Sequence, residues 1–237
     1  MTKIFSCECR RLLCNKFFIG LLAVLLFYAG QVFYLTVLPG VAHTAPFSPW
    51  SFGDFLSRMV PLLWIGSLFF LTFFTSGKAR RAAVLTDAAP MEPRRYALAR
   101  CGAALAGTAL LALAVLTEAA VFYGWYFGWY GWIELIAPAL VTLAPPLAVA
   151  LGSGWLLGRV RPWLLYVWMP LPFALALLPL PEALELWNGS FFTQYPLTLG
   201  TLDPAFSLPA AVLLVQCALL AAGIVLLALP PRRRHVE

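Results

Sequence analysis

Six nearly uncharged apolar runs alternate with shorter polar stretches along the chain. A bilayer core about 30 Å thick needs roughly 20 apolar residues in an α-helix, and each run is close to that length. The pattern therefore predicts six transmembrane helices, at residues 17–38, 57–76, 98–122, 133–157, 163–180 and 208–229. We expect an all-α integral membrane protein in which residues 1–237 form a single transmembrane domain.

The overall composition agrees with a membrane protein. Hydrophobic residues make up 62% of the chain and charged residues 11%, and the mean hydropathy is +0.86. So few charges do not cover the surface of a soluble globule. The formal net charge of +6 raises the question of nucleic acid. We expect no nucleic-acid partner, because the basic residues lie on one side of the predicted membrane and no aromatic stacking platform accompanies them.

The first sixteen residues are too polar to span a membrane, and they fit a basic amphipathic helix lying among membrane lipid headgroups. One side carries Ile4, Phe5, Leu12 and Leu13, and the other carries Lys3, Arg10, Arg11 and Lys16. A signal peptide is the alternative. The apolar run at 17–38 is longer than the roughly 7 to 15 residues of a signal peptide's apolar region, and no clear small-residue cleavage site follows it. This favours a retained span.

One long polar passage, residues 77–97, separates the second and third apolar runs. Together with Arg100 it carries six basic residues against only Asp87 and Glu92. Cytoplasmic loops of membrane proteins carry the excess of Lys and Arg, so this passage is expected in the cytoplasm. Six spans then place both termini and fifteen of the sixteen basic residues there, and only Arg58 falls on the other face.

The segments predicted on the outer face differ in character. Residues 39–58 contain three prolines and two glycines, which indicate an irregular loop that includes Asp54 and Arg58. Residues 122–134 are rich in Trp, Tyr and Gly, and they fit either an anchoring belt at the membrane interface or a site for stacking a ligand. Residues 181–207 are apolar but broken by prolines and glycines, which predicts a re-entrant outer segment of short helices before the last span.

The sequence lacks recognisable catalytic machinery. It has no GxxxxGK[ST], HExxH or GxSxG pattern, and neither His43 nor His235 has a carboxylate or thiol at a useful spacing. Cys7 and Cys9 form a Cys-x-Cys pair without nearby partners, so we expect buried or interfacial thiols and no metal site. The chain is therefore expected not to be an enzyme and to bind no cofactor of its own.

Glu118 is the one carboxylate well inside a predicted span, which makes it a candidate pathway residue. At about 1.5 Å per residue it lies roughly 27 Å along the helix from Arg100, near the outer boundary of the bilayer core. An interfacial carboxylate beside the aromatic cluster is the alternative. The small-residue pairs Gly154 with Gly158 and Ala103 with Gly107 predict close helix approaches, for ordinary packing or for gating.

The amphipathic start KIFSCECRRLLCNKFF, the passage KARRAAVLTDAAPMEPRRYALAR and the broken apolar segment before the sixth span together resemble the membrane subunit of a type-2 ABC exporter. This class includes drug, bacteriocin-resistance and polysaccharide permeases. The resemblance covers almost the whole chain as an architecture rather than as an invariant motif. The chain departs from it where the polar passage begins GKARRAAV, without the adjacent Glu of the acidic-basic start expected in this class.

The resemblance implies a division of labour. Residues 2–16, with Lys3, Arg10, Arg11 and Lys16, would form an elbow helix. A coupling helix around residues 82–93 would dock on a separate cytosolic ABC ATPase, which binds ATP and Mg; its candidate contacts are Ala82, Leu85, Thr86, Asp87, Pro90 and Glu92. A second permease copy or a paralogue would complete the transporter in a bacterial plasma membrane.

The apolar, aromatic interior of such an exporter favours an amphipathic or hydrophobic substrate, such as a drug, a peptide or a lipid-like molecule. Three alternatives stay open. The polar passage serves only to set topology, the chain is a secondary transporter or channel, or it is a membrane enzyme or a non-transporting membrane accessory protein.

Overall fold

The computed structural model describes residues 2–75, 93–178 and 180–229. All regular structure in these residues is helical, without a strand. Five of the described helical segments are long and apolar enough to cross a membrane; they are Lys16–Val37, Pro49–Thr75, Tyr96–Phe127, Trp132–Val160 and Ala210–Ala228. An all-α chain with the helix lengths and composition of a multi-pass membrane protein is thus confirmed.

The described residues form a series of helical elements. In chain order they are α1 (Thr2–Leu13), α2 (Lys16–Val32) with its π-helical continuation η1 (Phe33–Val37), α3 (Pro49–Thr75), α5 (Pro93–Phe127), the 3₁₀ helix η2 (Trp132–Leu135), α6 (Ile136–Val160), α7 (Leu164–Trp168), α8 (Leu171–Leu177), the 3₁₀ helix η3 (Glu182–Trp187), α9 (Ser190–Thr198) and α10 (Ala210–Ala228).

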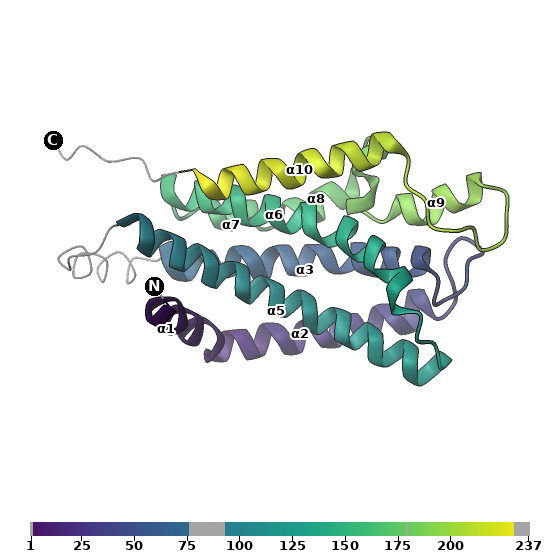
Figure 1. The fold of residues 1–237 in the computed structure, drawn as a ribbon, viewed down its shortest axis with the longest axis horizontal. Coiled ribbons are helices and arrows are strands. Elements are labelled where there is room, and N and C mark those ends of the chain that lie inside the picture. The colour runs from purple at the N-terminus through teal and green to yellow at the C-terminus, as the bar shows by residue number, and fades with distance from the viewer. Residues whose placement is uncertain (1, 76–92, 179, 230–237) are drawn as a thin grey trace.

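The long helices run side by side along one axis (Figure 1). At one end of the bundle α1 and α5 begin and α3, α6 and α10 end. We call this the basic end, because the described basic side chains belong to the elements that meet there; they are Arg10, Arg11, Lys16, Arg100, Arg159 and Arg161. The exception is Arg58, which lies near the start of α3 at the opposite end.

The centre of the bundle is α3, the most buried of the five long helices. Its side chains are apolar on nearly all sides, and Phe55, Met59 and Trp64 are fully buried. A helix that is hydrophobic all round is stable only when other elements surround it. Here α2, α5, α6 and α9 all pack against α3, so the remaining helices are arranged around it.

The predicted outer loop at 39–58 is wrong in its second half. Helix α3 begins at Pro49, eight residues before the predicted span, and includes both Asp54 and Arg58. Proline suits the first turn of a helix because its missing N–H would have no partner there. The Arg58 Nε donates to Asp54 Oδ2 at 2.9 Å one turn away, and this pairing lets a carboxylate that is only 1% exposed lie inside the helix.

The prediction of one continuous helix over residues 163–180 is also wrong. The structure has two short helices, α7 and α8, separated by Met169 and Pro170. Pro170 lacks an N–H and its ring clashes with the preceding turn, so the first helix ends there. At about 1.5 Å per residue the segment Leu164–Leu177 reaches roughly 21 Å, which is less than the thickness of a bilayer core.

The predicted short helices before the last span are present as η3 and α9. They cover the start of α3: Trp50 packs between Phe191 and Phe206, and its Nε1 donates to the Pro204 carbonyl at 2.7 Å. Gly53 lies against the Phe192 ring, which leaves no room for a Cβ. The segment at residues 181–207 therefore packs against the start of α3 through aromatic side chains.

Small residues bring helices together as their spacing predicts. Gly107 of α5 lies against Leu12 of α1 and Phe70 of α3, and a Cβ there would be 2.8 Å from Leu12 Cδ2. Gly154 faces Leu68 and Leu71 of α3 in the same way. Gly152 meets the backbone of Gly223, so α6 and α10 approach each other closely at this point.

Candidate functional site at the basic end

The candidate coupling contacts lie outside the described residues; they are Ala82, Leu85, Thr86, Asp87, Pro90 and Glu92. The helices on either side of them are described. Helix α3 ends at Thr75 and α5 begins at Pro93, and Figure 1 places both ends near α1. The candidate site is therefore built from α1 and the beginning of α5.

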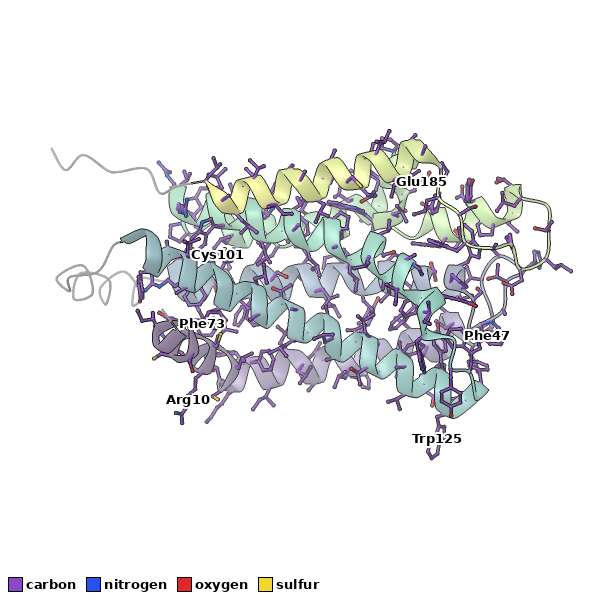
Figure 2. The ribbon with its side chains drawn as sticks, viewed as in Figure 1. Arg10, Phe47, Phe73, Cys101, Trp125 and Glu185 are labelled. Atoms are coloured by element: carbon purple, nitrogen blue, oxygen red, sulfur yellow. The ribbon has the colours of Figure 1, made fainter. Side chains whose placement is uncertain are left out.

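The predicted amphipathic helix is present, but it ends earlier than expected. Helix α1 stops at Leu13, and Lys16 is the first residue of α2. Asn15 caps the start of α2, since its Oδ1 accepts a hydrogen bond from the Phe17 N–H at 3.2 Å. Arg10 and Arg11 are on α1, and Figure 2 shows Arg10 pointing away from the bundle. The side chain of Lys3 lies outside the described part.

Glu8 is the centre of the contact between α1 and α5. It is buried on the same helix face as Ile4 and Leu12, four residues away in each direction. The Tyr96 hydroxyl donates to Glu8 Oε1 at 2.9 Å, and Arg100 Nη2 donates to the Tyr96 oxygen at 2.6 Å. We call Glu8, Tyr96 and Arg100 the Glu8–Arg100 junction.

Charge and stacking add to these hydrogen bonds. Arg100 Nε lies 3.6 Å from Glu8 Oε1, and its guanidinium lies over the rings of Tyr96 and Phe74, 4.1 and 5.8 Å from their centroids. Arg11 Nη1 is 3.9 Å from Glu8 Oε2, but its side chain is half exposed. Arg100 is therefore the main countercharge of Glu8, and it also contacts α3 through Phe74.

The cysteines of α1 differ in their surroundings. Cys7 is exposed, whereas Cys9 is partly buried. Burial, and then the neighbouring Glu8 carboxylate, raise the pKa of the Cys9 thiol. A thiol with a raised pKa reacts slowly with alkylating reagents, since the thiolate is the nucleophile. All five cysteines are free thiols, and Cys7, Cys14 and Cys217 are exposed. The described residues contain no group of three metal-ligating side chains.

A second contact at the basic end joins α6 to α10. The Arg159 guanidinium lies 4.5 Å from the centroid of the Trp155 ring, and its Nη1 donates to the Leu229 carbonyl at 2.9 Å. This carbonyl follows the last turn of α10, where helix carbonyls lack intrahelical partners and favour a cation. Helices α1, α5, α6 and α10 are thus all fastened by arginine side chains at one end of the bundle.

An apolar cavity of about 240 Å³ lies toward the opposite end, between α3, α5 and the start of α6. Its lining is almost wholly hydrophobic; it consists of Phe52, Leu116, Ala119, Ala120, Trp132, Leu135, Ile136 and Ala139. A cavity of this kind suits an apolar group better than an ion or a sugar. Glu118 is not in its lining. It lies on the other side of α5, where its carboxyl group faces Gly30 of α2.

Glu8 is the residue of the candidate site that was not predicted from the sequence. The amphipathic helix was predicted from its basic and apolar residues alone, without its one acidic residue. The signal was present, because Glu8 follows Ile4 and precedes Leu12 by four residues each, which puts a carboxylate on the apolar face of the helix. An acidic residue on such a face requires a buried cation, and Arg100 and Tyr96 supply the partners.

Comparisons with protein-family models, with curated proteins and with solved structures find no match to this chain. At the basic end, the Glu8–Arg100 junction connects the first turns of α5 to α1, and the contact between Arg100 and Phe74 connects them to α3.

Proposed function

We propose that this chain is the transmembrane permease subunit of an ATP-binding cassette exporter, driven by a separate cytosolic ATPase. The basic end is then the cytoplasmic end, since positive side chains gather on the cytoplasmic side of membrane proteins. Helix α1 serves as the elbow helix in the headgroup region. Helices α7 and α8 are a broken fifth crossing, because α6 ends at the basic end and α9 lies at the opposite end.

The Glu8–Arg100 junction is the observation that carries this proposal. The predicted coupling passage leads directly into α5, and Arg100 lies in the first turns of that helix. A partner that moves the passage moves the start of α5, and the buried ion pair carries α1 along with it. A loop that serves only to set topology needs no such buried polar connection to a neighbouring helix.

The apolar cavity supports a hydrophobic or amphipathic substrate. Apolar side chains recognise an acyl chain or an aromatic group by excluding water from it, and they offer no hydrogen bonds to a sugar. The cavity lies at the end opposite the cytoplasmic one in this assignment. It is therefore on the side of the membrane to which an exporter delivers its substrate.

Purification from the native host tests the proposal. The tagged chain, solubilised in a mild detergent, is expected to bring down a soluble protein in stoichiometric amount that hydrolyses ATP. In proteoliposomes that hydrolysis should be coupled to movement of a hydrophobic dye across the membrane. A chain that purifies without an ATPase, and that moves the dye with an ion gradient alone, would be a secondary transporter instead.

Substitutions in the coupling passage should separate hydrolysis from transport. For Leu85→Ala and Asp87→Ala we expect the dye transported per ATP hydrolysed to fall by about tenfold or more, as for truncation of an interface hot spot. The measurement compares ATP turnover and dye transport in the same vesicles. Ala89→Ser, in the same passage, is the control. Full coupling in both variants would exclude this passage as the docking segment.

Filling the cavity should lower transport of an apolar substrate. Ala120→Phe places a ring in the space between α5 and α6, and we expect transport of the hydrophobic dye to fall about tenfold, the scale of a lost pocket contact. Ala137→Phe is the matched control, since Ala137 is exposed on α6 and does not line the cavity. Equal losses in both variants would show that the cavity holds no substrate.

A further inference from the structure

The exposed surface shared by α2 and α5 differs from the exposed surface of α10. Gln31 and Tyr34 of α2 and Tyr126 of α5 are exposed there, among large apolar side chains such as Leu35 and Val121. Both helices begin at the basic end and run in the same direction (Figure 1). Successive turns of the two helices therefore face each other along this surface.

Glu118 lies where the same two helices face each other. Its Oε1 is close to Gly30, where a Cβ would be only 3.7 Å away. The residue as a whole is half-buried, and its Oε2 is a buried atom without a hydrogen-bond partner among the described residues. Burying a carboxyl oxygen in a membrane without a hydrogen-bond donor costs free energy. A donor from outside the described residues would remove this cost.

A hydrogen bond between Tyr34 and Tyr126 joins the two helices one turn farther along. The two side chains are 52% and 49% exposed, so the pair lies at the surface rather than in the core. Tyr34 also packs edge-on against Phe122, one helical turn from Glu118. Gln31 and Tyr34 of α2 and Glu118 and Tyr126 of α5 are the polar residues of this surface, and we call them the α2–α5 polar face.

The exposed surface of α10 shows what this bundle presents to lipid. Its exposed residues are all apolar or weakly polar, namely Ala, Leu, Ile, Val and Cys. The hydroxyl groups of Tyr34 and Tyr126 pair with each other. Lipid tails cannot satisfy the Gln31 amide or the Glu118 carboxyl group, so a surface that holds these two residues is not built for lipid alone. Polar side chains between membrane helices hydrogen-bond across protein contacts.

We propose that the α2–α5 polar face is the contact surface for a second copy of this chain. The proposal rests on the proposed function for its expectation of two permease subunits, and on these contacts for the surface. The face is self-complementary: Glu118 is an acceptor without a donor, and the Gln31 amide supplies two N–H donors. In a two-fold contact the same face meets itself, and Gln31 of each copy comes beside the partner copy's Glu118, whose half-buried side chain must turn its carboxyl group toward that donor.

Cysteine cross-linking between two tagged copies tests this contact. In a chain whose native cysteines are replaced by serine, Gln31→Cys is placed in one copy and Glu118→Cys in a differently tagged copy. We expect copper-phenanthroline to link the two tags in native membranes. The control pair is Leu214→Cys with Val225→Cys on the exposed surface of α10. Equal cross-linking of both pairs, or of the control pair alone, overturns the proposal.

Step counting by photobleaching gives a second measurement on the purified chain in lipid vesicles. The wild-type chain is expected to be dimeric over a range of protein densities. Glu118→Leu is expected to need about tenfold more protein in the membrane for the same dimer fraction, since interhelical hydrogen bonds contribute on that scale.

The proposed dimer surface and the proposed exporter function are tested by different outcomes. A wild-type chain that stays monomeric at every density, or a Glu118→Leu variant that dimerises as well as the wild type, overturns the proposed surface. A chain that dimerises through this surface but brings down no ATPase contradicts only the proposed function.

Discussion

Replacing Arg100 with alanine is expected to release α1 from the bundle. Arg100 is the main countercharge of Glu8, and the side chains of the pair are only 12% and 8% exposed. Removing one partner of a buried ion pair leaves the other charge without compensation, at a cost of roughly 3 kcal/mol. We expect Arg100→Ala to lower the melting temperature in detergent and to increase maleimide labelling of Cys9, which is partly buried in the native chain.

Two controls separate this effect from a general loss of charge. Arg11→Ala removes a half-exposed partner of the same carboxylate, and we expect a change below about 1 kcal/mol. The double variant Glu8→Leu with Arg100→Leu replaces the whole pair with apolar groups, and it should restore most of the stability. Labelling of the exposed Cys7 should be the same in all variants. Unchanged Cys9 labelling in Arg100→Ala would mean that the ion pair does not hold α1.

The lengths of the apolar runs predicted the long helices well. The runs at 17–38, 98–122, 133–157 and 208–229 all coincide with helices long enough to cross a membrane. This worked because backbone groups in lipid must be satisfied within the segment, which leaves the α-helix as the structure of an isolated apolar run. Hydropathy alone did not predict the start of α3. Asp54 and Arg58 are charged, which indicates a loop, but they form an ion pair with each other inside the helix.

Local chemistry changed the prediction at Met169 and Pro170. An apolar run of sufficient length predicts one helix, and the run at 163–180 has this length. The proline breaks it into α7 and α8, and the following η3 and α9 provide the packing that a shorter segment needs. Run length therefore predicts a crossing, but it does not show whether the crossing is one helix. Proline alone does not decide this either, since α6 stays continuous through Pro145 and Pro146 whereas the run at 163–180 is divided at Pro170.

The candidate site was predicted only in part, for a different reason. Arg10 and Arg11 were expected on an amphipathic helix, and they are there. Arg100 was expected only to set topology, yet it pairs with a residue about ninety positions earlier in the chain. No periodicity or local propensity joins Glu8 to Arg100. Their contact arises because α1 folds back onto α5, with Leu12 lying against Gly107.

The packing of α10 depends on an even closer approach. A Cβ at position 223 would lie 2.5 Å from the carbonyl carbon of Ala148 and 2.6 Å from its oxygen. On the other side, Gly152 meets the carbonyl oxygen of Gly223. These are contacts with backbone atoms, which cannot turn aside as a flexible side chain can. Any larger residue at position 223 must push α10 away from α6.

Gly223→Leu is therefore expected to destabilise the chain by about 3 kcal/mol, at the upper end of the range for overpacking. For a chain of this size that corresponds to a melting temperature lower by about 6 to 12 °C, measured in detergent by tryptophan fluorescence. Gly20→Leu is the matched control, because a Cβ at Gly20 of α2 meets nothing within 4 Å. Leucine has the better helix propensity, so this control should be neutral or stabilised by up to about 1 kcal/mol. Equal losses at the two positions would mean that glycine at 223 is not required for the packing of α6 on α10.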